Sequence, residues 1–258
     1  MIHGMQKVVF ITGASSGLGK GLAIKFAQKG YAVALAARRF SEVEVLANTL
    51  SEQGCRVLPL HCDVTEKQSV QEAVQQCVAQ FGPVDIMVAN AGISLATLGK
   101  KMCSDTFKQI WDTNVLGPVY CYEAVTPSMI QRRAGQLVSI SSLAAFRGLP
   151  EAGGYSSSKA ALTSLTESLR IDLKPFNIKV SLIQPGWIQT PMTDKNRYKM
   201  PFLVSYEKGV DAIYKAIHKQ VAVYSFPWPL AMIVRVGRLL PAWLYDSCIG
   251  GRKNRKSD

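Results

Sequence analysis

Four residues of this chain have types and a spacing suited to moving a proton: Asn114, Ser142, Tyr155 and Lys159. If Tyr155 begins a helix, Lys159 lies one turn further along the same face, so its ammonium group can stand beside the phenol through a shared ligand. A tyrosine normally titrates near pH ~10, and a fixed positive charge lowers its pKa toward the range in which acid–base catalysts work. Short motifs also arise by chance, so an exposed Tyr and Lys on a helix is the alternative interpretation.

The elements that must position these residues follow an alternating pattern. From residue 7 to about 185, short and nearly continuous apolar runs alternate with longer helical patterns, as is typical of parallel strands covered by helices on both faces. The predicted strands are Lys7–Thr12, Ala32–Ala37, Arg56–His61, Val84–Ala89, Gln136–Ser141 and Lys179–Gln184, and the predicted helices are Leu18–Lys29, Glu42–Gln53, Glu66–Gln80, Ser104–Arg132 and Tyr155–Lys174. We therefore expect a doubly wound, Rossmann-type α/β sheet of about seven strands in one domain covering residues 1–258.

A glycine-rich segment joins the first predicted strand to the first predicted helix. It has the spacing Gly-x-x-x-Gly-x-Gly and contains Gly13, Ser15, Ser16, Gly17, Leu18 and Gly19. Glycines let the backbone turn sharply and approach a ligand, and the helix N-terminus presents free N–H groups to an anion. The segment predicts a dinucleotide site, and a glycine-rich turn without a ligand is the alternative.

Two arginines follow the second predicted strand, at Arg38 and Arg39. A protein that binds NAD commonly has Asp or Glu here, about 20 residues after the glycine motif, to accept hydrogen bonds from ribose hydroxyls. Guanidinium groups are instead suited to bidentate contact with a phosphate. The two arginines therefore favour NADP(H) over NAD(H) as the cofactor, with NAD(H) as the second choice. The alternative interpretation is that Arg38 and Arg39 are only an exposed charge pair at a strand end.

Composition excludes several other classes of protein. With 258 residues, 48% hydrophobic and 19% charged, the chain can bury a sizeable core. Its six cysteines form no Cys-x-x-Cys pair, and its three histidines lie far apart, which disfavours a metal site and a Ser-His-Asp hydrolase. No signal-peptide pattern precedes the first apolar run, so we expect reduced thiols in a cytoplasmic protein.

The net charge of +12 is concentrated near the C-terminus, where the last 64 residues contain 12 Lys/Arg against 4 Asp/Glu. Such a bias can indicate nucleic acid, anionic lipid or simple solubility. Because these basic residues flank apolar surface and no base-reading motif is present, we predict no nucleic-acid partner.

These motifs together resemble the short-chain dehydrogenase/reductase superfamily. The matching segments, in the order and approximate spacing of that family across about residues 7–191, are Thr12–Gly19, Asn90-Ala91-Gly92, Asn114, Ser142, Tyr155 with Lys159, and Pro185-Gly186. The resemblance implies that Tyr155 is the general acid in reduction and the base in oxidation. Lys159 would bind the nicotinamide ribose and lower the Tyr155 pKa, and Ser142 would hold the substrate oxygen. Asn114 would mark a helix irregularity whose backbone carbonyl holds a water in a proton relay.

The same resemblance implies further cofactor-binding residues. Asp63 and Val64 would contact the adenine, while Asp63 or Thr65 could cap the helix that follows at Glu66, and both roles could hold together. Asn90, Ala91 and Gly92 would lie beside the cofactor, where Asn90 could equally serve to fix the backbone. The loop after the sixth strand, with Pro185, Gly186, Ile188 and Thr190, would contact the nicotinamide carboxamide.

The C-terminal part departs from the family pattern. We expect residues 191–204 to form a substrate loop and residues 205–258 an atypical extension, with a helix at Tyr206–Lys219, an edge strand at Val221–Phe226, an apolar helix at Leu230–Trp243 and a basic tail at Gly251–Lys256. The apolar helix contains charges that disfavour a membrane span, but its composition fits either a lid over the substrate cleft or a peripheral membrane contact. Both favour a lipophilic substrate such as a steroid, retinoid, long-chain or sphingoid-type compound.

The sequence thus predicts an NADP(H)-dependent oxidoreductase that interconverts a carbonyl and a secondary alcohol. The alternative is a dinucleotide-binding regulatory or membrane-docking module with little turnover. The family resemblance implies a homodimer built on the helices that contain Asn114 and Tyr155, and leaves a tetramer open.

Overall fold

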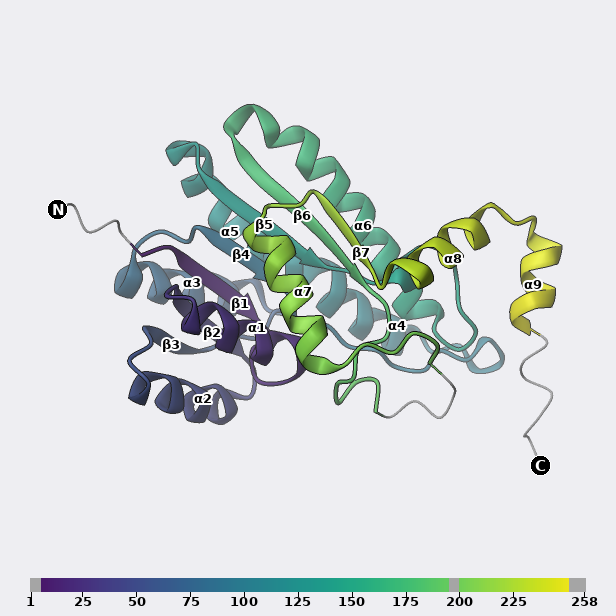
Figure 1. Ribbon diagram of the computed structural model, residues 1–258, viewed down its shortest axis with the longest axis horizontal. Helices are drawn as coiled ribbons and strands as arrows, with labels where there is room; N and C mark the ends of the chain where they lie inside the picture. The colour runs from purple at the N-terminus through teal and green to yellow at the C-terminus, as the bar shows by residue number, and fades with distance from the viewer. Residues whose placement is uncertain (1–5, 195–199, 251–258) are drawn as a thin grey trace.

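The computed structural model describes residues 6–194 and 200–250. Within these ranges, a seven-stranded parallel sheet with the order β3-β2-β1-β4-β5-β6-β7 forms the centre of the molecule (Figure 1). The strands are β1 Val8–Thr12, β2 Ala32–Ala37, β3 Val57–His61, β4 Ile86–Ala89, β5 Gly135–Ile140, β6 Ile178–Pro185 and β7 Val223–Phe226. The predicted doubly wound sheet is confirmed, and the strand order reverses between β1 and β4.

Helices cover both faces of this sheet (Figure 1). The helices are α1 Gly17–Gln28, α2 Phe40–Glu52, α3 Lys67–Phe81, α4 Ser104–Trp111, α5 Gly117–Arg132, α6 Gly153–Asp172, α7 Tyr206–His218, α8 Trp228–Leu239 and α9 Ala242–Gly250. In β1, Val9 and Ile11 point into the core shared with α1, α2 and α7, whereas Val8 and Phe10 point into the core shared with α3 and α5. This two-residue alternation explains why β1 is apolar at every one of these positions.

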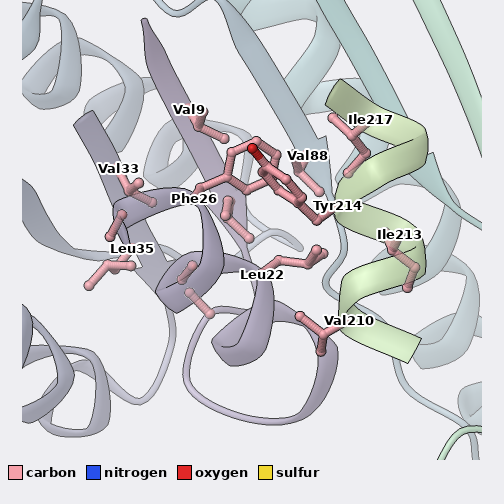
Figure 2. Packing of buried hydrophobic residues seen from close by; sticks show 14 of the residues in the cluster. Val9, Leu22, Phe26, Val33, Leu35, Val88, Val210, Ile213, Tyr214 and Ile217 are labelled. Carbon is pink, nitrogen blue, oxygen red and sulfur yellow. The ribbon is translucent and has the colours of Figure 1, made fainter. Parts of the chain in front are cut away.

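The contact between α1 and α7 fixes the helix that follows β1 (Figure 2). Phe26 of α1 packs edge-on against Tyr214 of α7, with ring centroids 5.0 Å apart. A side chain at Gly21 would lie 2.6 Å from the Tyr206 hydroxyl, so glycine permits the close approach of the two helices. The same Tyr206 hydroxyl donates to the carbonyl of Gly17 at 3.0 Å, which anchors the first turn of α1 at the end of β1.

The predicted continuous helix Ser104–Arg132 is wrong in one respect, because a π-helical turn at Asp112–Leu116 separates α4 from α5. Asn114 is fully buried in this turn. Residue 118 is a proline, which has no N–H to donate the bond that an α-helix would give to the Asn114 carbonyl. The irregularity that the family resemblance implied at Asn114 is therefore present.

The predicted apolar helix Leu230–Trp243 is also wrong as a single element. The chain instead forms α8 and α9, which project beyond the sheet on the side where β7 ends (Figure 1). Leu240 adopts an extended conformation, as expected for a residue that precedes a proline, and Pro241 ends the first helix. None of the helices described here is long and apolar enough to cross a membrane. The predicted basic tail Gly251–Lys256 lies outside the described residues.

Candidate active site

A large cavity lies at the carboxyl ends of the parallel strands, as the strand order predicts. Its volume is about 1040 Å³, and its lining runs from the glycine-rich segment after β1, past the ends of β4, β5 and β6, to α8 and α9. A cavity of this size is at the upper end of the range for a small-molecule or cofactor site. The predicted site residues that line it are Gly13, Ser15, Ser16, Gly17, Leu18, Arg38, Arg39, Asp63, Val64, Asn90, Ala91, Gly92, Ser142, Tyr155, Lys159, Pro185, Gly186, Ile188 and Thr190.

Tyr155 and Lys159 lie on the first two turns of α6, on the side that faces the cavity. The Lys159 ammonium lies 5.8 Å from the centroid of the Tyr155 ring, and it donates to the carbonyl of Ile140 at 2.9 Å. Lys159 is buried and Tyr155 is half-buried. The predicted one-turn spacing therefore brings a buried cation beside a phenol at the end of β5.

Burial changes the charge behaviour of Lys159. Removal of the ammonium from water lowers the Lys159 pKa from its ordinary value to about 8, because a charged group loses its hydration in the interior. The side chain remains mainly cationic below that pH and becomes neutral above it. Any electrostatic effect of Lys159 on Tyr155 is therefore present at neutral pH and lost in moderately alkaline solution.

Ser142 lies two residues after the end of β5 and caps the start of a 3₁₀ turn at Leu143–Ala145. Its hydroxyl accepts a hydrogen bond from the Ala144 N–H at 3.1 Å and lies 3.5 Å from the carbonyl of Pro185. The turn thus orients the hydroxyl at the cavity wall that also contains Tyr155.

Asn114 acts behind the cavity wall rather than on it. Its side-chain amide accepts from the Ile93 N–H at 2.8 Å, and donates to the Ile93 carbonyl at 2.9 Å and to the Ser158 hydroxyl at 3.0 Å. A Cβ at Gly92 would lie 3.2 Å from Asn114 Oδ1 and 3.3 Å from Lys159 Nζ. Asn114 therefore ties the segment after β4 to α6, close to the buried ammonium.

Asn90 also fixes backbone, which was one of the two roles left open by the sequence. Its side-chain nitrogen donates to the Thr12 carbonyl at 2.9 Å, and the Thr12 hydroxyl accepts from the N–H groups of Asn90 and Ala91 at 3.1 Å. A side chain at Gly19 would overlap the Gly13 carbonyl and Asn90 Nδ2. Among the predicted residues, Gly19 and Asn114 are the two that do not line the cavity, and Gly19 permits the close packing behind it.

The first turn of α1 faces the polar end of the cavity. Gly13 and Gly17 have positive φ angles of 67° and 52°, a conformation that glycine adopts without strain. Within the described residues no side chain caps the helix at Ser16, while Ser16, Gly17 and Leu18 line the cavity. A helix N-terminus in this setting attracts an anionic group.

The two arginines after β2 border the same polar end. Arg39 donates to the hydroxyls of Ser15 and Ser16 at 2.9 and 2.8 Å. Arg38 is more than half exposed and lies 3.8 Å from the Asp63 carboxylate. Asp63 accepts from the backbone and hydroxyl of Thr65 at 2.9 and 2.8 Å, which closes a local turn ahead of α3. No side chain in the described part of the chain caps the start of α3 at Glu66, so the capping role predicted as an alternative for Asp63 is wrong.

The loop after β6 closes the opposite wall. Ile188 is buried, and the Val204 N–H donates to the Trp187 carbonyl at 3.0 Å, which joins the far end of the predicted substrate loop to its base. The Thr190 N–H donates to the Thr193 hydroxyl at 2.9 Å. Residues 195–199 of this loop lie outside the described ranges.

Comparison with known proteins agrees with this geometry. The sequence model of the family described as short chain dehydrogenase matches residues 7–201. The chain belongs to the short-chain dehydrogenase family. An oxidoreductase of Myxococcus xanthus is 39% identical over 241 residues, which cover 93% of this chain and 95% of that protein. The 3-oxoacyl-(acyl-carrier-protein) reductase FabG of Staphylococcus epidermidis is 31% identical over 191 residues, covering 74% of this chain and 78% of that protein.

Solved structures show the same fold. An alcohol dehydrogenase of the archaeon Thermococcus sibiricus, complexed with 5-hydroxy-NADP, is 30% identical with a TM-score of 0.77, covering 86% of this chain and 93% of that one. A short-chain dehydrogenase of Burkholderia phymatum in complex with NAD superposes with a TM-score of 0.83 at 22% identity, covering 100% of this chain and 99% of that one. The predicted family and enzyme class are confirmed, and this chain is a short-chain dehydrogenase/reductase.

The other end of the short-chain dehydrogenase cavity is apolar. Its lining comes from the turn after β5, from Trp187 and Met192, and from α8 and α9. The apolar side chains that line this end are Leu143, Phe146, Leu149, Trp187, Met192, Leu230, Met232, Ile233, Val234, Val236, Leu240 and Ile249. Among the described residues no group of three or more His, Cys, Asp or Glu side chains could hold a metal ion.

Several residues that shape the site escaped the sequence analysis. Thr12 anchors the segment after β4, and the Ser141 hydroxyl donates to the Lys159 carbonyl at 3.0 Å, yet both look like ordinary strand-end residues in the sequence. Arg147 lines the apolar end and reaches the end of α8, 90 residues further along the chain. A polar residue at the end of a predicted buried strand was the available signal for Ser141, whereas the sequence contains no signal for the contact of Arg147.

Proposed function

We propose that this chain is an NADP(H)-dependent oxidoreductase that interconverts a carbonyl and a secondary alcohol on a lipophilic substrate. The observation that supports this most directly is the buried Lys159 ammonium beside Tyr155, between a polar end and an apolar end of one cavity. When bound, the cofactor supplies hydride to the carbonyl carbon or accepts it from the alcohol. The chain's own residues bind the cofactor, orient the substrate and move the proton.

Tyr155 donates its phenolic proton to the carbonyl oxygen during reduction and takes the proton back during oxidation. The Lys159 ammonium stabilises the resulting phenolate, which would lower the pKa of Tyr155 toward neutral pH. The ammonium is held for this role by the Ile140 carbonyl at 2.9 Å. Such positioned proton transfer typically contributes a factor of about 10²–10⁴ in rate.

Ser142 donates a hydrogen bond to the substrate oxygen and so stabilises the negative charge that develops there. Asn114 supports the return of a proton to Tyr155. Pro118 has no N–H to donate to the backbone carbonyl of Asn114, so this carbonyl can hold a water that relays protons through Lys159. Its amide keeps the π-helical turn in place through Ile93 and Ser158.

The residues at the polar end fit a dinucleotide. The uncapped first turn of α1 and the hydroxyls of Ser15 and Ser16 offer hydrogen-bond donors for a pyrophosphate. Asp63 and Val64 border the position expected for the adenine, and Asn90 to Gly92 line the path toward Lys159. Pro185, Gly186, Ile188 and Thr190 border the position expected for the nicotinamide carboxamide.

The preference for NADP(H) rests on Arg38 and Arg39. Arg39 is held beside the hydroxyls of Ser15 and Ser16, which together form a corner suited to a 2′-phosphate. The Asp63 carboxylate is paired with Arg38, so it is partly neutralised where it would otherwise repel that phosphate. We expect NAD(H) to bind as well, but more weakly.

The preference for a lipophilic substrate rests on the apolar lining contributed by α8 and α9 and by the turn after β5. These helices follow the region that the family model matches, which ends at residue 201. Steroids, retinoids, and long-chain or sphingoid-type compounds have the apolar surface that such a wall would remove from water, whereas a sugar does not.

The direct test is an assay of NADPH oxidation by the purified protein with a panel of apolar ketones and aldehydes, repeated with NADH. We expect turnover with apolar carbonyl compounds and a higher kcat/KM for NADPH than for NADH. Tight NADPH binding without turnover across the panel would instead support the alternative function, a regulatory or membrane-docking module. Equal use of NADH would remove the role proposed for the two arginines.

A homodimer is the proposed assembly, built on α4, α5 and α6. These helices and the segments beside them expose large apolar side chains, with Trp111 40%, Leu116 41% and Ile171 71% exposed. Mass measurement in solution tests the dimer, and Ile171→Asp is expected to weaken it.

A peripheral contact with an anionic membrane is proposed for the outer face of α8 and α9. Trp228, Leu239 and Trp243 are 75%, 83% and 70% exposed and do not line the cavity. The nearby arginines and the basic residues at 252–256 would complement anionic headgroups. We expect co-sedimentation with phosphatidylcholine vesicles that contain phosphatidylserine. Binding should be lost in Trp228→Ala/Trp243→Ala, and sedimentation equal to that of a vesicle-free control would contradict the contact.

A further inference from the structure

The wall formed by α8 and α9 is anchored unequally along its length. At the start of α8, Leu230 and Ala231 are buried against Leu143, and Trp187 packs against the same cluster. A Cβ at Gly186 would lie 2.8 Å from Leu230 Cδ2, so the helix approaches the loop after β6 as closely as a glycine allows. Apolar packing therefore fixes the first turn of α8.

The rest of the wall has little packing of this kind. Ile233 and Val236 line the cavity but are 56% and 55% exposed, and Leu239 is 83% exposed. The last carbonyls of a helix have no donors within the helix and need partners from elsewhere. In α8 the Leu240 N–H donates to the Gly237 carbonyl at 3.3 Å, and further donors to the last carbonyls must come from outside the helix.

Arg147 satisfies them from outside the helix. Its Nη1 donates to the carbonyls of Gly237 at 2.9 Å and Leu240 at 2.8 Å, and lies 3.3 Å from the carbonyl of Arg238. A guanidinium at this position also opposes the negative end of the helix dipole. One side chain thus caps α8 with charge-assisted hydrogen bonds.

The same guanidinium holds α9. Its central carbon lies 4.0 Å from the centroid of the Tyr245 ring, a distance typical of a cation–π contact. The Tyr245 hydroxyl donates to the carbonyl of Gly148, the residue after Arg147, at 2.7 Å. Both helices are therefore attached to one short segment of the chain.

That segment lies between Ser142 and Tyr155, and both Arg147 and Tyr245 line the cavity. We propose that Arg147 is a specificity-determining positioning residue, which latches α8 and α9 over the apolar end and keeps that end closed around a long substrate. The proposal rests on the lipophilic substrate class proposed above. Arg147 acts through the two helices and does not touch the reacting atoms.

The latch predicts an effect that depends on substrate length. A short ketone reaches Ser142 and Tyr155 without extending along α8, whereas a long one depends on the wall to remove its chain from water. Loss of Arg147 should therefore raise KM for a long ketone about tenfold, and leave kcat and the KM of a short ketone within about twofold.

The experiment compares the wild type with Arg147→Ala, Arg147→Lys and Arg133→Ala. Arg133 is a matched control, because it also donates to a backbone carbonyl, that of Pro175 at 2.8 Å, but lies away from the cavity. Steady-state kinetics with NADPH are measured for butanone and for a long-chain methyl ketone. Hydrogen exchange is measured in parallel over residues 228–249, without substrate.

We expect Arg147→Ala to raise the long-to-short KM ratio about tenfold and to speed exchange in α8 and α9, with NADPH affinity unchanged. Arg147→Lys should show smaller changes in the KM ratio and in exchange than Arg147→Ala, since lysine keeps the charge but not the planar fork. Arg133→Ala should change neither the KM ratio nor the exchange. Equal KM changes for both ketones, or unchanged exchange, would overturn the proposal. A wild type that reduces neither ketone contradicts the proposed function and with it the specificity role, while exchange still decides whether Arg147 holds the helices.

Discussion

The two ends of the cavity are built in different ways. At the cofactor end, side chains such as Thr12, Asn114 and Lys159 are buried and bonded to the backbone at the ends of the strands. At the substrate end, α8 and α9 lie beyond the sheet and expose much of their apolar surface. Beyond the buried start of α8, they are attached by a few contacts, chiefly those of Arg147, Arg235 and Tyr245. The cofactor end is part of the protein core, whereas the substrate end is formed by helices that are attached to the core.

This difference separates chemistry from specificity. Groups that move a proton must be held within a fraction of an ångström, which the sheet and the buried amide network provide. A wall that selects substrates by their apolar surface tolerates more variation, because hydrophobic contact is not directional. The family model accordingly ends at residue 201, before α8 and α9 begin. We expect changes at the first end to alter rates and changes at the second to alter substrate choice.

Apart from Tyr155→Phe, the largest effect is expected at Ser142. Ser142→Ala removes the hydroxyl proposed to stabilise charge on the substrate oxygen, and should lower kcat about 10²-fold in assays with a good ketone substrate. NADPH affinity, measured by fluorescence titration, should not change. If kcat falls less than about threefold, Ser142 serves only the turn that it begins at Leu143.

Arg39 tests the polar corner of the cofactor end. Arg39→Ala removes a guanidinium that is held by Ser15 and Ser16, and should raise the Kd of NADPH roughly 10- to 100-fold, the usual effect of a lost charge-assisted hydrogen bond. The Kd of NADH should change little. Arg56→Ala, at the opposite end of the strands, is the control. Equal losses for both cofactors would show that Arg39 supports the loop rather than a phosphate.

The pH dependence of cofactor binding tests the burial of Lys159. Its pKa is lowered to about 8, so the ammonium proposed to bind the nicotinamide ribose is lost as the pH rises above that value. The Kd of NADPH should therefore rise with pH above about 8, by at most about tenfold per pH unit, and stay flat below it. Lys159→Met should bind more weakly and show no such rise. A flat profile for the wild type would contradict the role of the ammonium.

The smallest effect is expected at Gly186. A methyl group there would press on Leu230 Cδ2, so Gly186→Ala should displace the start of α8 slightly. We expect KM for a long ketone to rise about threefold with kcat nearly unchanged. A larger fall in kcat would mean that the two ends are coupled more tightly than the comparison implies.

Much of the cofactor end could be predicted from the sequence, because its signals are local. Apolar strands such as β2, with the sequence Ala-Val-Ala-Leu-Ala-Ala, are buried at every residue, and glycines at 13 and 17 have the positive φ angles that make them necessary. The one-turn spacing of Tyr155 and Lys159 translates directly into one face of α6. In these places the local pattern and the fold agree.

The substrate end could not be predicted as well, because its geometry depends on distant contacts. Periodicity indicated one apolar helix at Leu230–Trp243, but Pro241 divides it, and the signal of the proline was outweighed by the length of the apolar pattern. The attachment of Arg147 to Gly237 joins residues 90 positions apart and follows no local rule. The π-helical turn at Asn114 was expected from the family resemblance, and periodicity alone predicted an unbroken helix.

The most direct test of the central claim is Tyr155→Phe, measured for both turnover and NADPH affinity. The substitution removes only the phenolic oxygen, so the ring still fills its place beside Lys159. We predict that kcat for ketone reduction falls by about 10³-fold or more, while the Kd of NADPH stays within about twofold of the wild-type value. Unchanged turnover would contradict the assignment of Tyr155 as the proton donor and, with it, the chemistry proposed for this cavity.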